Sequence, residues 1–170
     1  MSNVVFKSDN LDFVNVSTDL IDDYLIMIND PMIQECISTK KGIYTYENEV
    51  NWVNKKLEEN ALVFSIIERV SGQFVGNIEL MHVCDGRAEM GICLTPKFIN
   101  RHYGTEAINR ILEYAFNELK LNVVELIVFS NNLRAIHCYK KIGFVEYDIR
   151  KNVKETDGVS VNNIYMRLVK

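Results

Sequence analysis

Residues 61–94 hold three apolar segments separated by two short polar turns. The turns are Ser71-Gly72 and Asp85-Gly86, and the segments read ALVFSIIERV, QFVGNIELMHV and RAEMGICL. An Asp-Gly pair is typical of a tight hairpin because both residues tolerate a positive φ angle. The pattern therefore predicts an antiparallel meander of three strands.

Helical and strand-like segments alternate around this meander. Ser17 and Thr45 offer side-chain oxygens that cap two predicted helices, and Pro31 is expected to end or kink the first. Residues 31–44 are expected to be irregular. Gly143 suits the end of a late helix. The remaining segments are strands at 11–17, 122–129, 144–151 and 162–169, and helices at 18–30, 46–60, 104–119 and 131–143. This order predicts an α/β or α+β fold in one domain, 1–170, with a single mixed central sheet flanked by about four helices.

Composition excludes several classes of protein. The net charge is −4, and lysine and arginine form only short pairs, which argues against nucleic acid as a partner. No apolar run is long enough to span a bilayer, and the N-terminus does not resemble a signal peptide, so we expect a cytoplasmic protein without a membrane partner. The four cysteines lack metal-ligand spacing, which predicts free thiols and no metal site: Cys36, Cys84, Cys93 and Cys138. Three of them lie in apolar segments, so buried thiols are expected there.

Residues 100–116, NRHYGTEAINRILEYAF, combine a polar loop with an amphipathic helix. The first amides of a helix lack internal partners and favour an anion, so this loop is a candidate phosphate site. Gly104 would let the backbone approach the ligand, and Arg101 would add charge. A plain strand-loop-helix connection is the alternative. The candidate donors are Asn100, Arg101, His102, Tyr103, Gly104 and Thr105.

The late segment NNLRAIHCYKKIGF (131–144) resembles the GCN5-related N-acetyltransferases, whose corresponding helix often reads N-x-x-A-I-x-x-Y-x-K-x-G-F. The resemblance extends from about Val75 to Lys170. It implies the GNAT fold, acetyl-CoA as cosubstrate without a metal, and a loop at 99–104 that holds the pyrophosphate. Ile99 and His102 replace the family's first loop residue and first glycine, and we expect binding to persist. The other cofactor contacts that the resemblance implies are Ile92, Cys93, Leu94, Asn132 and Lys141.

The resemblance also assigns chemistry. Tyr139 corresponds to the family's general acid, and a half-buried helix aromatic is the alternative. Glu79 alternates with apolar neighbours, which predicts that it faces solvent as a base that relays the amine's proton through water, or as an anchor for a cationic substrate or a basic side chain. Cys93 lies in an apolar strand that blunts its thiol, so direct attack by the amine is favoured over a relay through Cys93.

The acceptor amine is less constrained. The sequence is similar to bacterial spermidine/spermine N-acetyltransferases, and the segment Thr105-Glu106-Ala107 also occurs in ribosomal-protein N-terminal acetyltransferases. A small polyamine-like amine is the first prediction. A protein N-terminus, an amino sugar or aminoglycoside, or a non-catalytic acyl-CoA sensor are alternatives, and a homo-oligomer is possible. Acidic residues near the expected entrance would attract a cation: Asp22, Asp23, Asp30, Glu35, Glu47 and Glu49. Solvated helix faces are the simpler interpretation for most of them.

Overall fold

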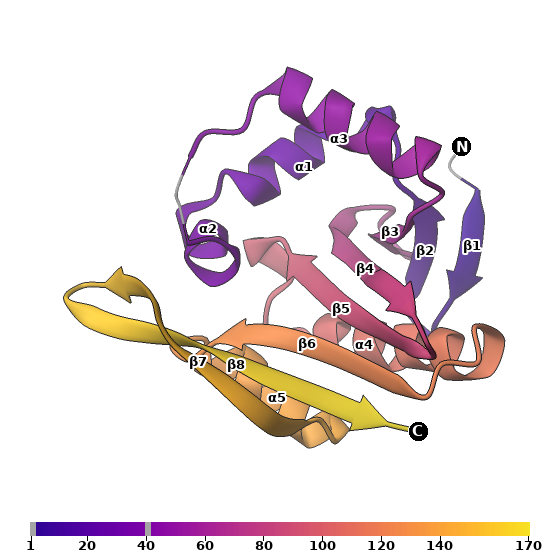
Figure 1. Cartoon of the computed structure of the whole chain (residues 1–170). Helices are drawn as coiled ribbons and strands as arrows, with labels where there is room; N and C mark the ends of the chain where they lie inside the picture. Colours follow the sequence, from indigo (N-terminus) through magenta and orange to yellow (C-terminus); the bar gives the residue numbers. More distant parts are fainter. Residues whose placement is uncertain (1–2, 40–41) are drawn as a thin grey trace.

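The computed structural model describes residues 3–39 and 42–170 (Figure 1). Its strands are β1 (Val4–Lys7), β2 (Leu11–Asn15), β3 (Leu62–Glu68), β4 (Phe74–Cys84), β5 (Arg87–Leu94), β6 (Val123–Phe129), β7 (Val145–Thr156) and β8 (Val159–Val169). Its α-helices are α1 (Ile21–Ile28), α2 (Pro31–Ile37), α3 (Tyr46–Glu58), α4 (Tyr103–Glu113) and α5 (Leu133–Ile142). Shorter helical turns are η1 (Thr18–Leu20), η2 (Pro96–Phe98) and η3 (Tyr114–Glu118).

All the strands belong to one eight-stranded sheet with the order β1-β2-β3-β4-β5-β6-β8-β7. Neighbours are antiparallel except for β5 and β6, which are parallel. The mixed sheet confirms the predicted fold class. The long β7–β8 hairpin forms one edge of the sheet (Figure 1).

Helices cover the two faces of the sheet in two groups. One apolar cluster joins α1, α2 and α3 to β3 and β4, and Ile21, Tyr24 and Val53 are among its fully buried members. The larger cluster packs α4 and α5 against the opposite face, with Ile108 and Ile111 at its centre. The predicted apolar stripes of these helices therefore face the sheet.

The N-terminal helices confirm two predicted caps and overturn one prediction. Ser17 accepts a hydrogen bond from the amide of Asp19, and Thr45 caps α3 within a capping box. The expectation of irregular structure at 31–44 is wrong for residues 31–37, which form α2; residues 38–39 and 42–44 are irregular as expected, and residues 40–41 lie outside the described part of the chain. Pro31 ends one helix and also begins the next, since proline at the first helical position needs no amide hydrogen.

The meander and its turns are as predicted. Asp85 and Gly86 have φ angles of 50° and 74°, the left-handed pair that joins β4 to β5. Gly143 ends α5 with φ 118°. The predicted strand at 11–17 is confirmed as β2, whereas β1 is too short to be recognised from its alternation.

Candidate active site

Strands β5 and β6 pair only at their beginnings. Arg87, Ala88 and Glu89 of β5 lie opposite residues 123–125 of β6, and beyond these pairs the two strands diverge (Figure 1). β4 continues to pair with β5 as far as Leu94. The backbone of β5 after Glu89 is therefore free of β6 on one edge. This edge includes the residues predicted to contact the pantetheine arm: Ile92, Cys93 and Leu94.

Residues 99–105 run from the loop into the first turn of α4, which begins at Tyr103. Asn100 and His102 have left-handed φ angles of 63° and 65°, a conformation that asparagine and histidine tolerate better than most residues. The first backbone hydrogen bond of α4 runs from the amide of Glu106 to the carbonyl of His102, at 3.0 Å. The amides of Tyr103, Gly104 and Thr105 therefore have no partner within the helix. This arrangement suits an anion.

Side chains of the same loop are used for packing. The guanidinium of Arg101 lies 5.4 Å from the ring centroid of Phe98, and the hydroxyl of Tyr103 donates to Glu68. A Cβ atom on Gly104 would come within 3.3 Å of Leu94 Cδ1, so glycine permits close packing of α4 on β5. His102 is exposed, as expected for a surface substitution.

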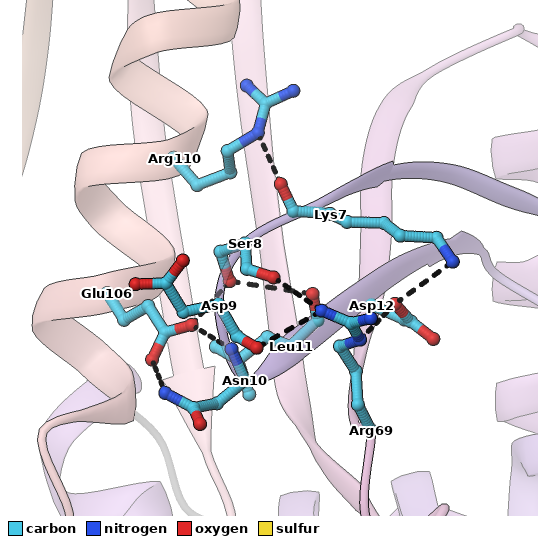
Figure 2. A network of polar contacts seen from close by, with 9 residues as sticks. All are labelled: Lys7, Ser8, Asp9, Asn10, Leu11, Asp12, Arg69, Glu106 and Arg110. Atoms are coloured by element: carbon cyan, nitrogen blue, oxygen red, sulfur yellow. Dashed lines mark hydrogen bonds and ion pairs between the residues drawn. The ribbon is translucent and has the colours of Figure 1, made fainter.

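Glu106 fixes the position of α4, a function that its residue type alone did not reveal. Its Oε1 accepts hydrogen bonds from Ser8 Oγ at 2.6 Å and from the amide of Asn10 at 2.7 Å (Figure 2). Its Oε2 accepts from Asn10 Nδ2 at 3.0 Å. One turn later, Arg110 Nε donates to the carbonyl of Lys7 at 2.8 Å (Figure 2). The β1–β2 turn therefore holds the helix that begins at the candidate phosphate loop.

Tyr139 belongs to the apolar cluster on the α4–α5 side of the sheet. It is buried, and its ring packs edge-on against Phe144 with centroids 5.9 Å apart. Burial raises the pKa of Tyr139, and the nearby thiols of Cys138 and Cys93 raise it further. The phenol therefore stays protonated at neutral pH, as a proton donor must.

Glu79 lies on the opposite face of the sheet, and its side chain is 26% exposed, so the predicted exposure to solvent is only partial. It pairs with Gly91 of β5, and its Oε1 is 3.5 Å from the position of a Cβ atom on that glycine. Its Oε2 accepts a hydrogen bond from Lys56 Nζ of α3 at 2.7 Å. The carboxylate thus lies over β5 and already holds an ammonium group.

Cys93 shares this face, because it pairs with Asn77 of β4. Burial raises the pKa of its thiol to about 12, and Cys36 and Asp30 add to this effect. A thiol with this pKa is a poor nucleophile at neutral pH, which agrees with the predicted direct attack. All four cysteines are free; Cys84 is exposed, and the other three are half-buried rather than fully buried.

Thr95, which follows the last residue of β5, has a buried hydroxyl oxygen without a hydrogen-bond partner in the described structure. This orphaned polar atom follows directly on the free edge of β5. A polar ligand group in this place would satisfy it.

Asn132 and Lys141 lie at the two ends of α5. The Asn132 side chain caps the helix by accepting from the amide of Ala135 at 3.3 Å, and Thr105 Oγ1 contacts Cys138 Sγ at 3.4 Å. Lys141 is exposed on the last turn. Contacts of Asn132 and Lys141 with acetyl-CoA stay predictions.

The acidic residues expected at the entrance separate into different roles. Asp30 caps α2 by accepting from the amides of Met32 and Ile33. Glu35 binds Lys154 Nζ of the β7–β8 hairpin at 2.9 Å. Glu49 is 8% exposed, and burial raises the pKa of its carboxyl. Asp22 and Glu47 are exposed, and Asp23 is half-buried with a pKa raised by burial and by Asp22.

Helix α2 covers the region where β5 and β6 diverge, because it contacts both strands. Lys154 ties the β7–β8 hairpin to this region: its Nζ lies 3.5 Å from the carbonyl of Ser38, at the end of α2, and 4.1 Å from the ring centroid of Phe129 in β6. No local pattern indicated this contact, because residues 31–44 were expected to be irregular.

Two surface pockets lie beside these groups. The larger, of about 840 Å³, follows the outer side of α4 from His102 and Thr105 to Glu118. The smaller, of about 150 Å³, lies between Glu35 and the β7–β8 hairpin. Within residues 3–39 and 42–170, no three His, Cys, Asp or Glu side chains are grouped so as to hold a metal ion. Among the described helices, none combines the length and apolar character that a membrane crossing requires.

Comparisons with known proteins agree with this geometry. The spermidine N(1)-acetyltransferase of Vibrio cholerae is 32% identical over 95 residues, which cover 55% of each chain. The L-amino acid N-acetyltransferase AaaT of Escherichia coli is 27% identical over 124 residues, covering 68% of this chain and 74% of that protein. The first curated relatives are matched over only 55% and 61% of their length.

Solved structures show the same fold. The Vibrio cholerae spermidine N-acetyltransferase, in complex with CoA and spermine, superposes with a TM-score of 0.85 at 21% identity, covering 95% of this chain and 96% of that one. A GNAT-family acetyltransferase from Bacillus anthracis gives 0.83 at 22% identity over 96% of both chains. A family model described as an acetyltransferase (GNAT) domain matches residues 10–145. The chain therefore belongs to the GNAT acetyltransferase family.

Proposed function

We propose that the protein is a cytoplasmic N-acetyltransferase that moves the acetyl group of acetyl-CoA to a primary amine by direct attack. The observation that carries this proposal is that β5 stops pairing with β6 after Glu89, which leaves one backbone edge of β5 free. Tyr139 belongs to the apolar cluster on the α5 side of the sheet, and Glu79 lies on the α3 side, where it binds Lys56.

The residues present fit acetyl-CoA, which supplies the activated acetyl group. The unpartnered amides of Tyr103, Gly104 and Thr105 would hold the pyrophosphate, with Asn100, Arg101 and His102 beside them. The edge of β5 at Ile92, Cys93 and Leu94 would bind the pantetheine arm, and an amide there would polarise the thioester carbonyl. Ile99, Asn132 and Lys141 complete the proposed set.

Glu79 and Tyr139 would handle the protons. A primary amine is mostly protonated at neutral pH and attacks only after it loses that proton. Glu79 would accept the proton through water, or anchor the ammonium form. Tyr139 would donate a proton to the leaving sulfur, because its raised pKa keeps it protonated.

A small polyamine-like amine is our first candidate acceptor. The similarity to spermidine N-acetyltransferases supports it. The buried carboxyl of Glu49 and the half-buried carboxyl of Asp23, both on the α1–α3 side, support it as well. The match to the amino acid acetyltransferase AaaT favours a small amine as well. A protein N-terminus is the second candidate, because the Thr105-Glu106-Ala107 segment also occurs in ribosomal-protein acetyltransferases.

The test is release of free CoA thiol from acetyl-CoA with a panel of amines: spermidine, spermine, an aminoglycoside, an amino sugar, amino acids and N-terminal ribosomal peptides. Turnover with spermidine or spermine supports the first candidate. Turnover with peptides alone would move the function to protein modification. Binding of acetyl-CoA without turnover would make the protein a sensor and refute the proposal.

A further inference from the structure

Lys56 of α3 forms an ion pair with Glu79 of β4. Its Nζ lies 2.7 Å from Glu79 Oε2 and 5.9 Å from the ring centroid of Trp52. The pair is partly shielded, with 19% of the Lys56 side chain and 26% of the Glu79 side chain exposed. An ion pair that is screened from water in this way is stronger than one at the open surface.

The pair also lies next to the proposed reaction site. The carboxylate of Glu79 is over Gly91, and pairing between β5 and β6 has ended two residues earlier, at Glu89. Lys56 thus brings a primary ammonium group to the carboxylate that the proposed function assigns to the acceptor amine. The two ammonium groups are chemically alike.

We propose that Lys56 occupies the acceptor-ammonium position on Glu79 in the resting enzyme, so that a charged acceptor must displace it. This inference rests on the proposed function. Lys56 is then a specificity-determining residue, because it weakens the binding of any amine that cannot compete for Glu79. An acceptor with further charges gains contacts elsewhere and displaces Lys56 more readily.

The test compares Lys56→Met with the unaltered enzyme in steady-state kinetics, using the amine that the panel identifies. Methionine keeps most of the aliphatic stem and removes the charge. We expect the KM for the amine to fall roughly three- to tenfold, the range expected for loss of one competing ion pair of this kind. The KM for acetyl-CoA should not change.

Two further variants sharpen the result. Lys55→Met is the matched control, because Lys55 is exposed and pairs with Glu59 at 3.9 Å rather than with Glu79. It should leave both KM values unchanged. Lys56→Arg keeps the charge and can bind Glu79 with two nitrogens, so it should hold or raise the amine KM. If Lys56→Met does not bind CoA in calorimetry, it has lost its fold, and Lys56→Arg decides instead. A raised amine KM in Lys56→Arg then supports the proposal, and a lowered one contradicts it.

The outcomes separate the two proposals. An unaltered enzyme that acetylates no amine refutes the proposed function, whatever Lys56 does. The proposed displacement of Lys56 is overturned if the unaltered enzyme turns over and the amine KM of Lys56→Met is equal to or higher than that of the unaltered enzyme. Lys56 would then only orient Glu79.

Discussion

The carboxylate of Glu106 in α4 accepts hydrogen bonds from both the backbone amide and the side-chain amide of Asn10, at 2.7 and 3.0 Å. The β1–β2 turn and the first turn of α4 are thereby fixed to each other across 96 residues of sequence. Burial opposes ionisation of Glu106, but the hydrogen bonds from Ser8 and Asn10 outweigh it and lower the pKa of the carboxyl.

We expect Glu106→Ala to lower the free energy of unfolding by about 1–3 kcal/mol, since it leaves the Asn10 and Ser8 donors unpaired. The loosened α4 should also raise the KM for acetyl-CoA more than it changes kcat. Thermal unfolding and initial rates measure the two effects. Because the pKa of Glu106 is lowered, its stabilisation is present above pH 4.5, the ordinary pKa, and is lost as the pH falls through the folded-state pKa. Asn109→Ala, at an exposed position of α4, is the control and should change neither quantity.

Tyr139→Phe should reduce kcat by about a hundredfold or more, the usual contribution of a general acid. Phenylalanine keeps the ring that packs against Phe144, so the affinity for CoA should stay within about twofold of the unaltered protein. Single-turnover rates and calorimetry with CoA check both. An unchanged kcat would remove Tyr139 as the proton donor.

Glu79→Gln distinguishes the two roles of this carboxylate. If Glu79 relays the proton, kcat should fall at neutral pH and recover as the pH rises, because more of the amine is then already uncharged. If Glu79 only anchors the ammonium, the KM for the amine should rise at every pH with kcat nearly constant. A pH series of kcat and KM separates these patterns, and no effect on either would exclude both roles.

Glu49→Gln should stabilise the protein near neutral pH. The pKa of Glu49 is raised above 4.5 by burial, so the folded state loses stability as the pH rises from 4.5 through the raised pKa. Glutamine removes this penalty, and the melting temperature at pH 7–8 should exceed that of the unaltered protein. The difference should vanish at about pH 4, where both forms of the protein carry an uncharged side chain. A variant that melts lower at pH 7–8 would show that the ionised carboxylate has a stabilising partner.

Lys154→Met should weaken the attachment of the β7–β8 hairpin to α2. The Lys154 side chain is 8% exposed, and its ammonium group contacts Glu35 and the Phe129 ring. Its loss should therefore lower the free energy of unfolding by about 1–3 kcal/mol. Limited proteolysis should cut the hairpin near residues 155–160 faster than in the unaltered protein. Lys151→Met, on an exposed position of the same strand, is the control. Equal cleavage of all three proteins would show that Lys154 does not hold the hairpin.

Local signals in the sequence were sufficient for most of the sheet and for the family. The Asp85-Gly86 turn, the alternation around Glu79 and the capping residues Ser17 and Thr45 all depend on neighbours within a few positions. Pro31 was misread because the same residue ends one helix and begins another, and only packing on β5 and β6 shows which meaning holds.

The partners of the candidate residues could not be predicted from local patterns. Lys56 and Glu79 are 23 positions apart, and Glu35 and Lys154 are 119 positions apart. Their pairing depends on how whole helices settle on the sheet. The entrance residues therefore seemed equivalent in the sequence, although Asp30 caps a helix, Glu35 holds a hairpin and Glu49 is buried.

The two helix groups lie on opposite faces of the sheet, and the two proposed proton-handling residues are divided between them: Tyr139 belongs to the α4–α5 cluster, and Glu79 binds Lys56 of α3. Mutations in α1, α2 or α3 can change the side chains on one face of the sheet without changing the packing of α4 and α5 on the other face. Acceptor preference could therefore drift during evolution while nucleotide recognition stays under separate selection. For chemistry, the same division suggests inhibitors directed at the amine side alone, which would not need to compete with the abundant CoA of the cell.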